Sequence, residues 1–432
     1  MIINLIYRIL KMKKILFLLS GLVLSLTLAS CSMDMDNGGS HNYPSATIPG
    51  TIDEVVDYVY SIEVIEYDGT VLGNKYIHTT SKKSLFKDLA TYFDLEYEES
   101  EYGHYIKQIN SSMVDPNYAL MLYQNGKLSS TGVDDIILND NDSIRLVNER
   151  WNKELDETDR LVDKVIYSFM EDADSFLSET YNDFYLLAAI NKMMEMGYSK
   201  MNLDFLSDSY LEEIKNKDVN DIAPAQLLRH IMLLKASNTP LDKLKLHMEN
   251  TTVNPVGGPY GVFSDVPYYL ASRIAKANIK NIDAYKGLFK SELTSPSLGD
   301  AGALYMHVLG DLEEFDSEAR SNYLNAQKAK FQKDGVAFDE WSSHSVSAGC
   351  QIRGFAALGE NIRDEKYQVN GVDMVEAVLM YLVNDYEFKS SLDSEMPDNG
   401  FATPQILAGL MAYKMSRDYK LNNSFKAVDI FA

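Results

Sequence analysis

The hydrophobic pattern of this chain changes near residue 150, and that change limits the folds open to it. Between residues 62 and 148, short segments alternate apolar and polar residues, as half-buried strands do. From Trp151 onward, apolar residues recur with a period near 3.6, which predicts helices. We therefore expect a small β-rich domain over residues 51–150, followed by a helical domain over residues 151–432.

The β-rich segment predicts a small β-grasp-like domain. Residues 61–67 alternate like a half-buried strand, and residues 75–79 suit its hairpin partner. Residues 84–93 place leucines at helical spacing, so one helix should pack across the sheet. An Asn-Gly pair at residues 125–126 predicts a second hairpin, because these residues accept the positive φ angles of a type I′ turn.

The helical segment contains a repeat of paired helices. After a first helix at residues 157–176, Ala-containing apolar helices begin near Phe184, Ala225, Val266, Gly302, Ser345 and Ala402. A more polar helix follows each of them, at residues 205–215, 241–249, 282–292, 317–333, 372–384 and 424–431. Inner helices packed inside amphipathic outer helices predict a closed α6/α6 toroid, and an open α-solenoid is the alternative.

The N-terminus has the features of a targeting segment. A basic start at residues 12–14 precedes an apolar run over residues 15–29, and Cys31 closes a lipobox. The apolar run is shorter than the roughly 20 residues of a membrane span, so a transmembrane anchor is the weaker alternative. We expect residues 1–31 to be a lipoprotein signal peptide, whether translation starts at Met1 or Met12. Residues 32–50 should be a flexible tether.

Charge and cysteine content narrow the environment and the partners. A formal net charge of −23 argues against nucleic acid as a partner and against electrostatic adhesion to anionic lipid. Cys31 and Cys350 are the two cysteines of the chain, so lipidation of Cys31 leaves no intramolecular disulfide. We expect a protein anchored by lipid at Cys31 on the extracellular face of a bacterial membrane.

Three motifs in the β-rich segment carry a family resemblance. Residues 122–127 (LYQNGK), 132–134 (GVD) and 138–144 (LNDNDSI) resemble the transcobalamin-like C-terminal domain family, of the DUF4430 type. Leu120 stands where such domains often carry a large aromatic residue. Tyr123 or Tyr118 can replace that aromatic as a stacking surface.

The last two helical repeats carry a second resemblance. Residues 345–352 (SVSAGCQI), 356–361 (AALGEN) and 399–408 (NGFATPQILA) resemble the prenyltransferase and terpene-cyclase-like toroids of bacterial surface proteins. Toroid and transcobalamin-like domain together form the animal cobalamin carriers, where the toroid comes first. The resemblance therefore implies a binding protein for cobalamin or another corrinoid, with its two domains in reversed order.

The enzymes of the toroid family need groups that this chain does not show at the matching positions. A prenyltransferase zinc site needs Asp, Cys and His ligands, but residues 348–350 (AGC) and 401–403 (FAT) retain one cysteine alone. A cyclase needs an acid cluster facing an aromatic cavity, and the matching helix has none. The sequence therefore predicts a protein that is not an enzyme and needs no metal or cofactor, and a terpenoid-type enzyme is the weakest alternative.

Aromatic and amide side chains before and within the inner helices predict a ligand site at the mouth of the toroid. Such a combination suits a large, flat, amide-bearing ligand, which the resemblance identifies as a corrinoid. The candidate binding residues are Tyr123, Tyr260, Phe263, Tyr269, Tyr305, His307, Trp341, His344, Gln351, Asn399, Phe401 and Gln405.

Two classes of function follow from these features. In the first, the protein captures a small ligand in a cleft between the β domain and the toroid, and passes it to a transporter or surface protein. In the second, it is a surface module that binds a protein or a glycan without a small-molecule pocket. A deep aromatic cleft facing the β domain favours the first class, and a flat exposed patch favours the second.

Overall fold

A computed structural model describes residues 58–67, 69–79, 84–151, 155–180, 184–198, 208–258, 260–337, 343–420 and 424–432. The predictions for the signal peptide, Cys31, the tether and Trp341 lie outside the described residues. Residues Val56–Ala432 form one compact unit. Among the described residues, no helix combines the length and apolarity that crossing a membrane requires.

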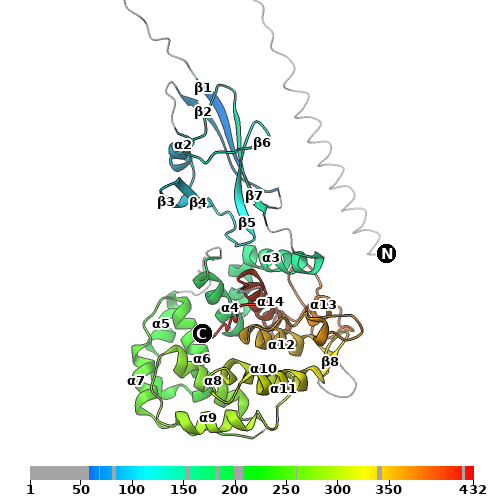
Figure 1. The fold of residues 1–432 in the computed structure, drawn as a ribbon. Coiled ribbons are helices and arrows are strands. Elements are labelled where there is room, and N and C mark those ends of the chain that lie inside the picture. The colour runs from blue at the N-terminus through cyan, green and yellow to red at the C-terminus, as the bar shows by residue number, and fades with distance from the viewer. Residues whose placement is uncertain are drawn as a thin grey trace, which may run out of the picture. The chain divides into compact units, whose positions relative to one another are not determined.

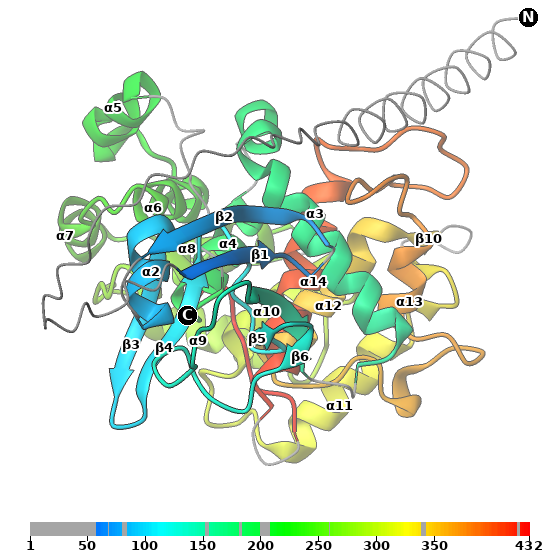
Figure 2. The same ribbon diagram turned by 90° about the horizontal axis from the view of Figure 1, so that it is seen from above.

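The first domain contains a five-stranded mixed sheet with the strand order β2-β1-β7-β5-β6 (Figure 1). β1 pairs antiparallel with β2 and parallel with β7, whereas β5 pairs antiparallel with β7 and β6. A separate hairpin is formed by β3 and β4 (Figure 2). The elements are β1 Tyr58–Ile65, β2 Val71–Thr79, α2 Leu85–Tyr92, β3 Leu95–Ser100, β4 Gly103–Ile109, β5 Tyr118–Gln124, β6 Lys127–Leu128 and β7 Ser143–Arg150.

Local sequence explains the elements of this domain. Ile62 of β1 is fully buried and pairs with Ile144 across the parallel ladder, which fixes the inward face of both strands. The Ser84 side chain caps α2 by accepting a backbone N–H bond from the first turn. Asn125 and Gly126 have φ angles of 53° and 75°, so the predicted turn is confirmed. A small sheet domain followed by many helices is likewise confirmed.

The helical domain alternates apolar and more polar helices. The apolar helices are α4 Phe184–Glu195, α6 Leu227–Ala236, α8 Val262–Ile274, α10 Gly299–Leu309, α12 Ser345–Ala357 and α14 Ala402–Asp418. The more polar helices are α3 Glu157–Thr180, α5 Asp208–Asn216, α7 Asp242–Asn250, α9 Ile282–Ser291, α11 Ser317–Lys328 and α13 Met374–Leu379. Short 3-10 turns η1 Val219–Asp221, η2 Pro224–Gln226 and η3 Glu365–Tyr367 lie between them.

The apolar helices contact one another in cyclic order. α4 contacts α6, α6 contacts α8, and the series continues through α10 and α12 to α14, which contacts α4 again. Glycines allow α12 and α14 to approach each other closely. A Cβ added to Gly409 of α14 would lie 2.4 Å from the backbone oxygen of Gly349 in α12, so any side chain there would force the two helices apart.

Three helix predictions near the ends of repeats were wrong. The helix expected at residues 372–384 is confined to α13, Met374–Leu379. The helix expected at residues 317–333 ends at Lys328, because Phe331–Gln332 forms strand β8 of a small sheet with β9 Gly335–Ala337 and β10 Ser343–His344. The segment expected as a helix at residues 424–431 is not helical. Its Val428 N–H instead donates 2.9 Å to the carbonyl of Ala356 at the C-terminal end of α12, an oxygen that also accepts from the Gly359 N–H.

Candidate ligand-binding site

Five of the residues expected at the mouth of the toroid lie in the core of the helical domain. Tyr269 and Tyr305 are buried, with ring centroids 5.0 and 6.0 Å from that of Phe289. The buried Gln351 amide donates to the Gly299 carbonyl and to Gln327 Oε1, at 2.8 and 3.0 Å. The oxygen of the buried Gln405 accepts 3.0 Å from Arg353 Nη1. These side chains support the helix packing rather than an exposed surface.

His307, the fifth of these residues, has both ring nitrogens engaged. Its Nδ1 lies 2.7 Å from Asp429 Oδ1, and Arg353 Nε donates to its Nε2 at 3.4 Å. Burial lowers the pKa of His307, although the Asp429 carboxylate opposes this shift. Burial in turn raises the pKa of Asp429, but His307 and Arg273 outweigh it and hold that pKa at about 2. His307 therefore belongs to a buried hydrogen-bond network that supports the fold.

Other expected residues do lie at the surface, near the N-terminal ends of the apolar helices. Tyr260 and Phe263 stand at the start of α8, and Tyr260 is 82% exposed. Phe401 is 56% exposed directly before α14. Asn399 and His344 are partly exposed nearby in the sequence, before α14 and α12. Tyr123 lies apart from them on β5, where its hydroxyl donates 2.9 Å to Glu149 of β7.

The β domain contacts the opposite end of α14 through a buried ion network. Asp115, in the loop before β5, pairs with Lys414 near the C-terminus of α14, and both side chains are fully buried. Lys414 Nζ also lies 3.1 Å from Asp163 of α3 and 2.8 Å from Asp418. At about 1.5 Å of rise per residue, Lys414 is on the order of 20 Å from Phe401. Phe401 therefore lies at the end of α14 that is remote from the β domain.

Each carboxylate of this network has a cation partner, although the carboxylates outnumber the cations. Arg417 pairs with Asp163 at 2.5 Å and with Asp418 at 2.7 Å. Burial lowers the pKa of Lys414, but the three surrounding carboxylates outweigh it and hold the pKa well above its usual range. Burial raises the pKa of Asp115 to about 6 against the pull of Lys414. The network therefore fixes the two domains to each other through residues remote in the sequence.

Aromatic packing completes this junction. The ring of Tyr167 in α3 lies 5.4 Å from that of Tyr67, which follows β1, and 6.1 Å from that of Tyr118 in β5. Such tilted and edge-on pairs add to the area that the junction buries. Ion pairs and aromatic packing together thus hold the β domain against the helical domain.

Beside these contacts lies a groove of about 500 Å³, which we call the junction groove. Its walls come from β4, from the residues around the start of β5, and from the ends of α4 and α14. Aromatic and thioether side chains provide much of the lining: Tyr105, Met113, Tyr118, Trp151, Met196 and Tyr419. Asp115, Asn148 and Lys107 supply polar groups.

Two aromatic residues of the junction groove are open to solvent. Trp151 is 59% exposed, and its indole N–H donates 2.9 Å to the carbonyl of Pro116, which orients the ring. Tyr105 is 61% exposed on β4. Burial raises the pKa of Tyr118 to about 12, so this hydroxyl keeps its proton at neutral pH and can donate a hydrogen bond. The groove therefore offers flat apolar surface together with a Tyr118 side chain whose hydroxyl stays protonated.

Sequence reasoning reached this groove only in part. Tyr118, named as a substitute for the missing aromatic at Leu120, lines it together with Leu120 itself, whereas Tyr123 does not. Trp151 was read as the point where the pattern changes, not as a site residue. A tryptophan at the boundary between the two hydrophobic patterns is the signal that the sequence offers. Within the described ranges, no group of three or more His, Cys, Asp and Glu side chains is placed to hold a metal ion.

Comparison with known proteins supports part of the expected family. Residues 83–150 match the family model described as "Domain of unknown function (DUF4430)", so the resemblance of the β domain is confirmed over that range. A solved structure from Ruminococcus gnavus, described as a candidate metal-binding protein, is 21% identical and has a TM-score of 0.19. The match covers 22% of this chain and 99% of that one. No curated protein matches.

Proposed function

We propose that this protein is a lipid-anchored extracellular binding protein that captures a small ligand in the junction groove. The observation that carries the proposal is a groove with an aromatic lining at a junction fixed by buried ion pairs. A preformed pocket with flat apolar walls and a few polar groups is the usual form of a small-molecule site. Because the junction is fixed before binding, little ordering free energy opposes capture.

We propose a corrinoid as the first ligand to test. We further propose that the helical domain is an α6/α6 toroid. The contact between α4 and α14 supports closure over an open solenoid, in which first and last repeats lie apart. A whole corrinoid is larger than the junction groove, so one edge of the macrocycle would enter and stack on Trp151 and Tyr105. The exposed Tyr260, Phe263 and Phe401, with Asn399 and His344, remain candidates for a second contact surface.

Isothermal titration of residues 32–432 with cyanocobalamin and with cobinamide tests this function. We expect saturable binding that Trp151→Ala weakens about tenfold, since stacking of one aromatic residue contributes on the order of 1 kcal/mol. Tyr76→Ala is the matched control, because Tyr76 is an exposed aromatic residue of β2 that does not line the groove. Absence of heat and of thermal stabilisation by either ligand would refute the corrinoid.

One observation favours a surface-interaction module as the second candidate. The β3–β4 hairpin exposes the rings of Tyr97, Tyr102 and Tyr105 next to several glutamates. Exposed tyrosines are common where proteins bind other proteins or glycans. If Tyr102→Ala abolishes binding to a glycan array while the titration with corrinoids shows no heat, this second function replaces the first.

A further inference from the structure

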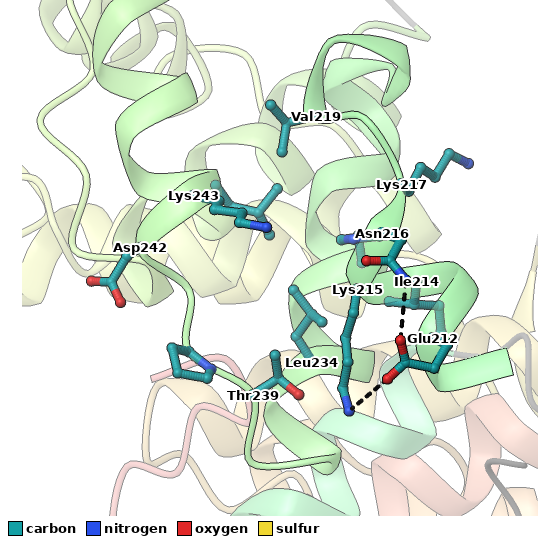
Figure 3. A pocket seen from close by; sticks show the side chains of 13 residues that line it. Glu212, Ile214, Lys215, Asn216, Lys217, Val219, Leu234, Thr239, Asp242 and Lys243 are labelled. Atoms are coloured by element: carbon teal, nitrogen blue, oxygen red, sulfur yellow. Dashed lines mark hydrogen bonds and ion pairs between the residues drawn. The ribbon is translucent and has the colours of Figure 1, made fainter. Parts of the chain in front are cut away.

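The helical domain contains a second pocket, separate from the junction groove and lined by no Phe, Tyr or Trp of the described residues. It has a volume of about 460 Å³ and lies between α5, η1, α6 and the start of α7 (Figure 3). This volume falls within the range of roughly 300–1,000 Å³ that small-molecule sites occupy. We call it the lysine pocket, after Lys215, Lys217 and Lys243 in its wall.

The lining of this pocket is rich in basic residues, although the chain as a whole is acidic. The protein has 63 acidic and 40 basic residues, yet three lysines and His230 line the lysine pocket beside only two carboxylates, Glu212 and Asp242. In the part of the chain that the structure describes, neither Lys217 nor Lys243 forms an ion pair. Uncompensated ammonium groups around a cavity create a positive potential that attracts an anion.

The two carboxylates do not neutralise Lys243. The Glu212 carboxylate accepts 3.1 Å from Asn216 Nδ2 and lies 4.0 Å from Lys215 Nζ. Both partners belong to α5, the helix that carries Glu212. In Figure 3 the Asp242 carboxylate points away from the other lining side chains, whereas the Lys243 ammonium points toward the side that Asn216 forms. Lys217 points outward in the same view. Lys243 is therefore the cation placed to meet a ligand, with Lys215 as its neighbour.

The base of the pocket is apolar. Ile214, Leu234 and Leu244 line it and are buried in the domain. Because these side chains are at most 5% exposed, a ligand that fills the cavity gains van der Waals contact with them more than it buries new apolar area. His230 also lines the pocket, where burial and the nearby Lys217 lower its pKa, so it is neutral at pH 7. Charge recognition thus rests on the lysines and shape on the leucines and isoleucine.

We propose that the lysine pocket binds a small organic carboxylate with an apolar body. The carboxylate meets the ammonium of Lys243, and the apolar body lies on Ile214, Leu234 and Leu244. An ammonium is a compact, strongly hydrated charge that binds such an anion without a fixed orientation, so the apolar surface selects the ligand. This site is independent of the junction groove and of the ligand proposed for it.

Titration of the full chain in detergent solution with 4-phenylbutyrate, with its neutral amide and with inorganic phosphate tests this site. We expect the carboxylate to bind, and the amide to bind about tenfold more weakly, a difference of about 1.4 kcal/mol. Phosphate should bind more weakly as well, because it has no apolar body. Equal affinity for the carboxylate and the amide, or tighter binding of phosphate, would overturn the proposal.

Two variants distinguish binding in the lysine pocket from attraction of the anion by the overall charge of the protein. Lys243→Met removes the ammonium and keeps an apolar stem, and it should weaken the carboxylate about tenfold while leaving the amide unchanged. Lys286→Met is the matched control, because Lys286 is an exposed lysine of α9 outside the pocket. Both residues are exposed, so both variants should fold. An equal loss of affinity in the two variants would mean that the anion binds through overall charge, which refutes the pocket.

Discussion

The junction groove and the lysine pocket have similar volumes, about 500 and 460 Å³, but opposite chemistry. In the groove, the lining carboxylate of Asp115 is paired with the buried Lys414, which three carboxylates surround, and rings and thioethers form much of the walls. In the lysine pocket, the walls are aliphatic and the ammonium of Lys243 has no carboxylate partner among the described residues. The compensation of charge, rather than the size of the cavity, distinguishes the ligands that we propose for them.

The two cavities also differ in what holds them open. The junction groove exists only while the β domain and the helical domain stay in contact, and residues from both form its walls. The lysine pocket is formed by helices and loops that follow one another between residues 212 and 244. A change at the junction should therefore affect the groove and spare the pocket.

Loss of the buried cation of the junction should have the largest effect. Among the described residues, Lys414→Met leaves the buried Asp115 without its cation, whereas Asp163 and Asp418 keep Arg417. Removing one member of a buried ion pair costs about 3–5 kcal/mol of unfolding free energy. Guanidinium denaturation should show this loss, together with loss of binding in the junction groove and retained binding of 4-phenylbutyrate. Lys286→Met should remain within about 0.5 kcal/mol of the parent.

A change of less than about 1 kcal/mol in the unfolding free energy of Lys414→Met would contradict this difference between the cavities, because the groove would then not depend on the ion network. Loss of both binding activities in a folded Lys414→Met protein would contradict it as well. The lysine pocket would then depend on the junction too.

An intermediate effect is expected in acid. The pKa of Asp429 lies at about 2, below its ordinary value of 3.8, because His307 and Arg273 outweigh the effect of burial. A lowered pKa contributes stability above pH 3.8 that is lost as the pH falls toward 2. The loss should reach about 2 kcal/mol for this carboxyl group. Asp429 lines neither cavity, so its protonation acts on the stability of the helical domain and not through contact with a ligand.

Asp429→Asn isolates this contribution. The variant should be less stable than the parent at neutral pH, and the difference should shrink as the pH falls from 4 to 2 in urea titrations. A constant difference over that interval would show that the pKa of Asp429 is not lowered in the folded protein.

The smallest expected effect is that of salt. Raising the ionic strength from about 0.01 M to about 1 M shortens the screening length from roughly 30 Å to 3 Å. Carboxylate binding in the lysine pocket should weaken several-fold, whereas stacking in the junction groove should change little. Parallel titrations at both ionic strengths measure this contrast. Equal salt dependence in the two cavities would remove the distinction between them.

Local patterns allowed much of the fold to be predicted. Strand alternation, the Asn-Gly turn at residues 125–126 and the spacing of the apolar helices all reflect short-range physics, and the structure confirms the β domain before the helices. The final segment was mistaken for a helix, because its apolar residues suit either conformation. Its Val428, Ile430 and Phe431 are buried in a non-helical segment.

The candidate site was harder to predict, because it depends on contacts between distant residues. Asp115 and Lys414 are separated by most of the chain, and no local pattern pairs them. Gln351 and Gln405 lie on helices that are buried on every side, so periodicity cannot divide their residues between core and rim. The lysine pocket had a weak signal in Lys215, Lys217 and Lys243, basic residues in an acidic chain.

The contact between α4 and α14 has a consequence for how such a domain can change in evolution. A linear array of helical pairs can gain or lose a terminal pair by duplication or deletion, since the remaining interfaces stay as they were. Here the first and last apolar helices cover each other. Inserting or deleting one pair would expose two apolar faces at once, so the number of pairs is expected to stay constant while the loops between them diverge.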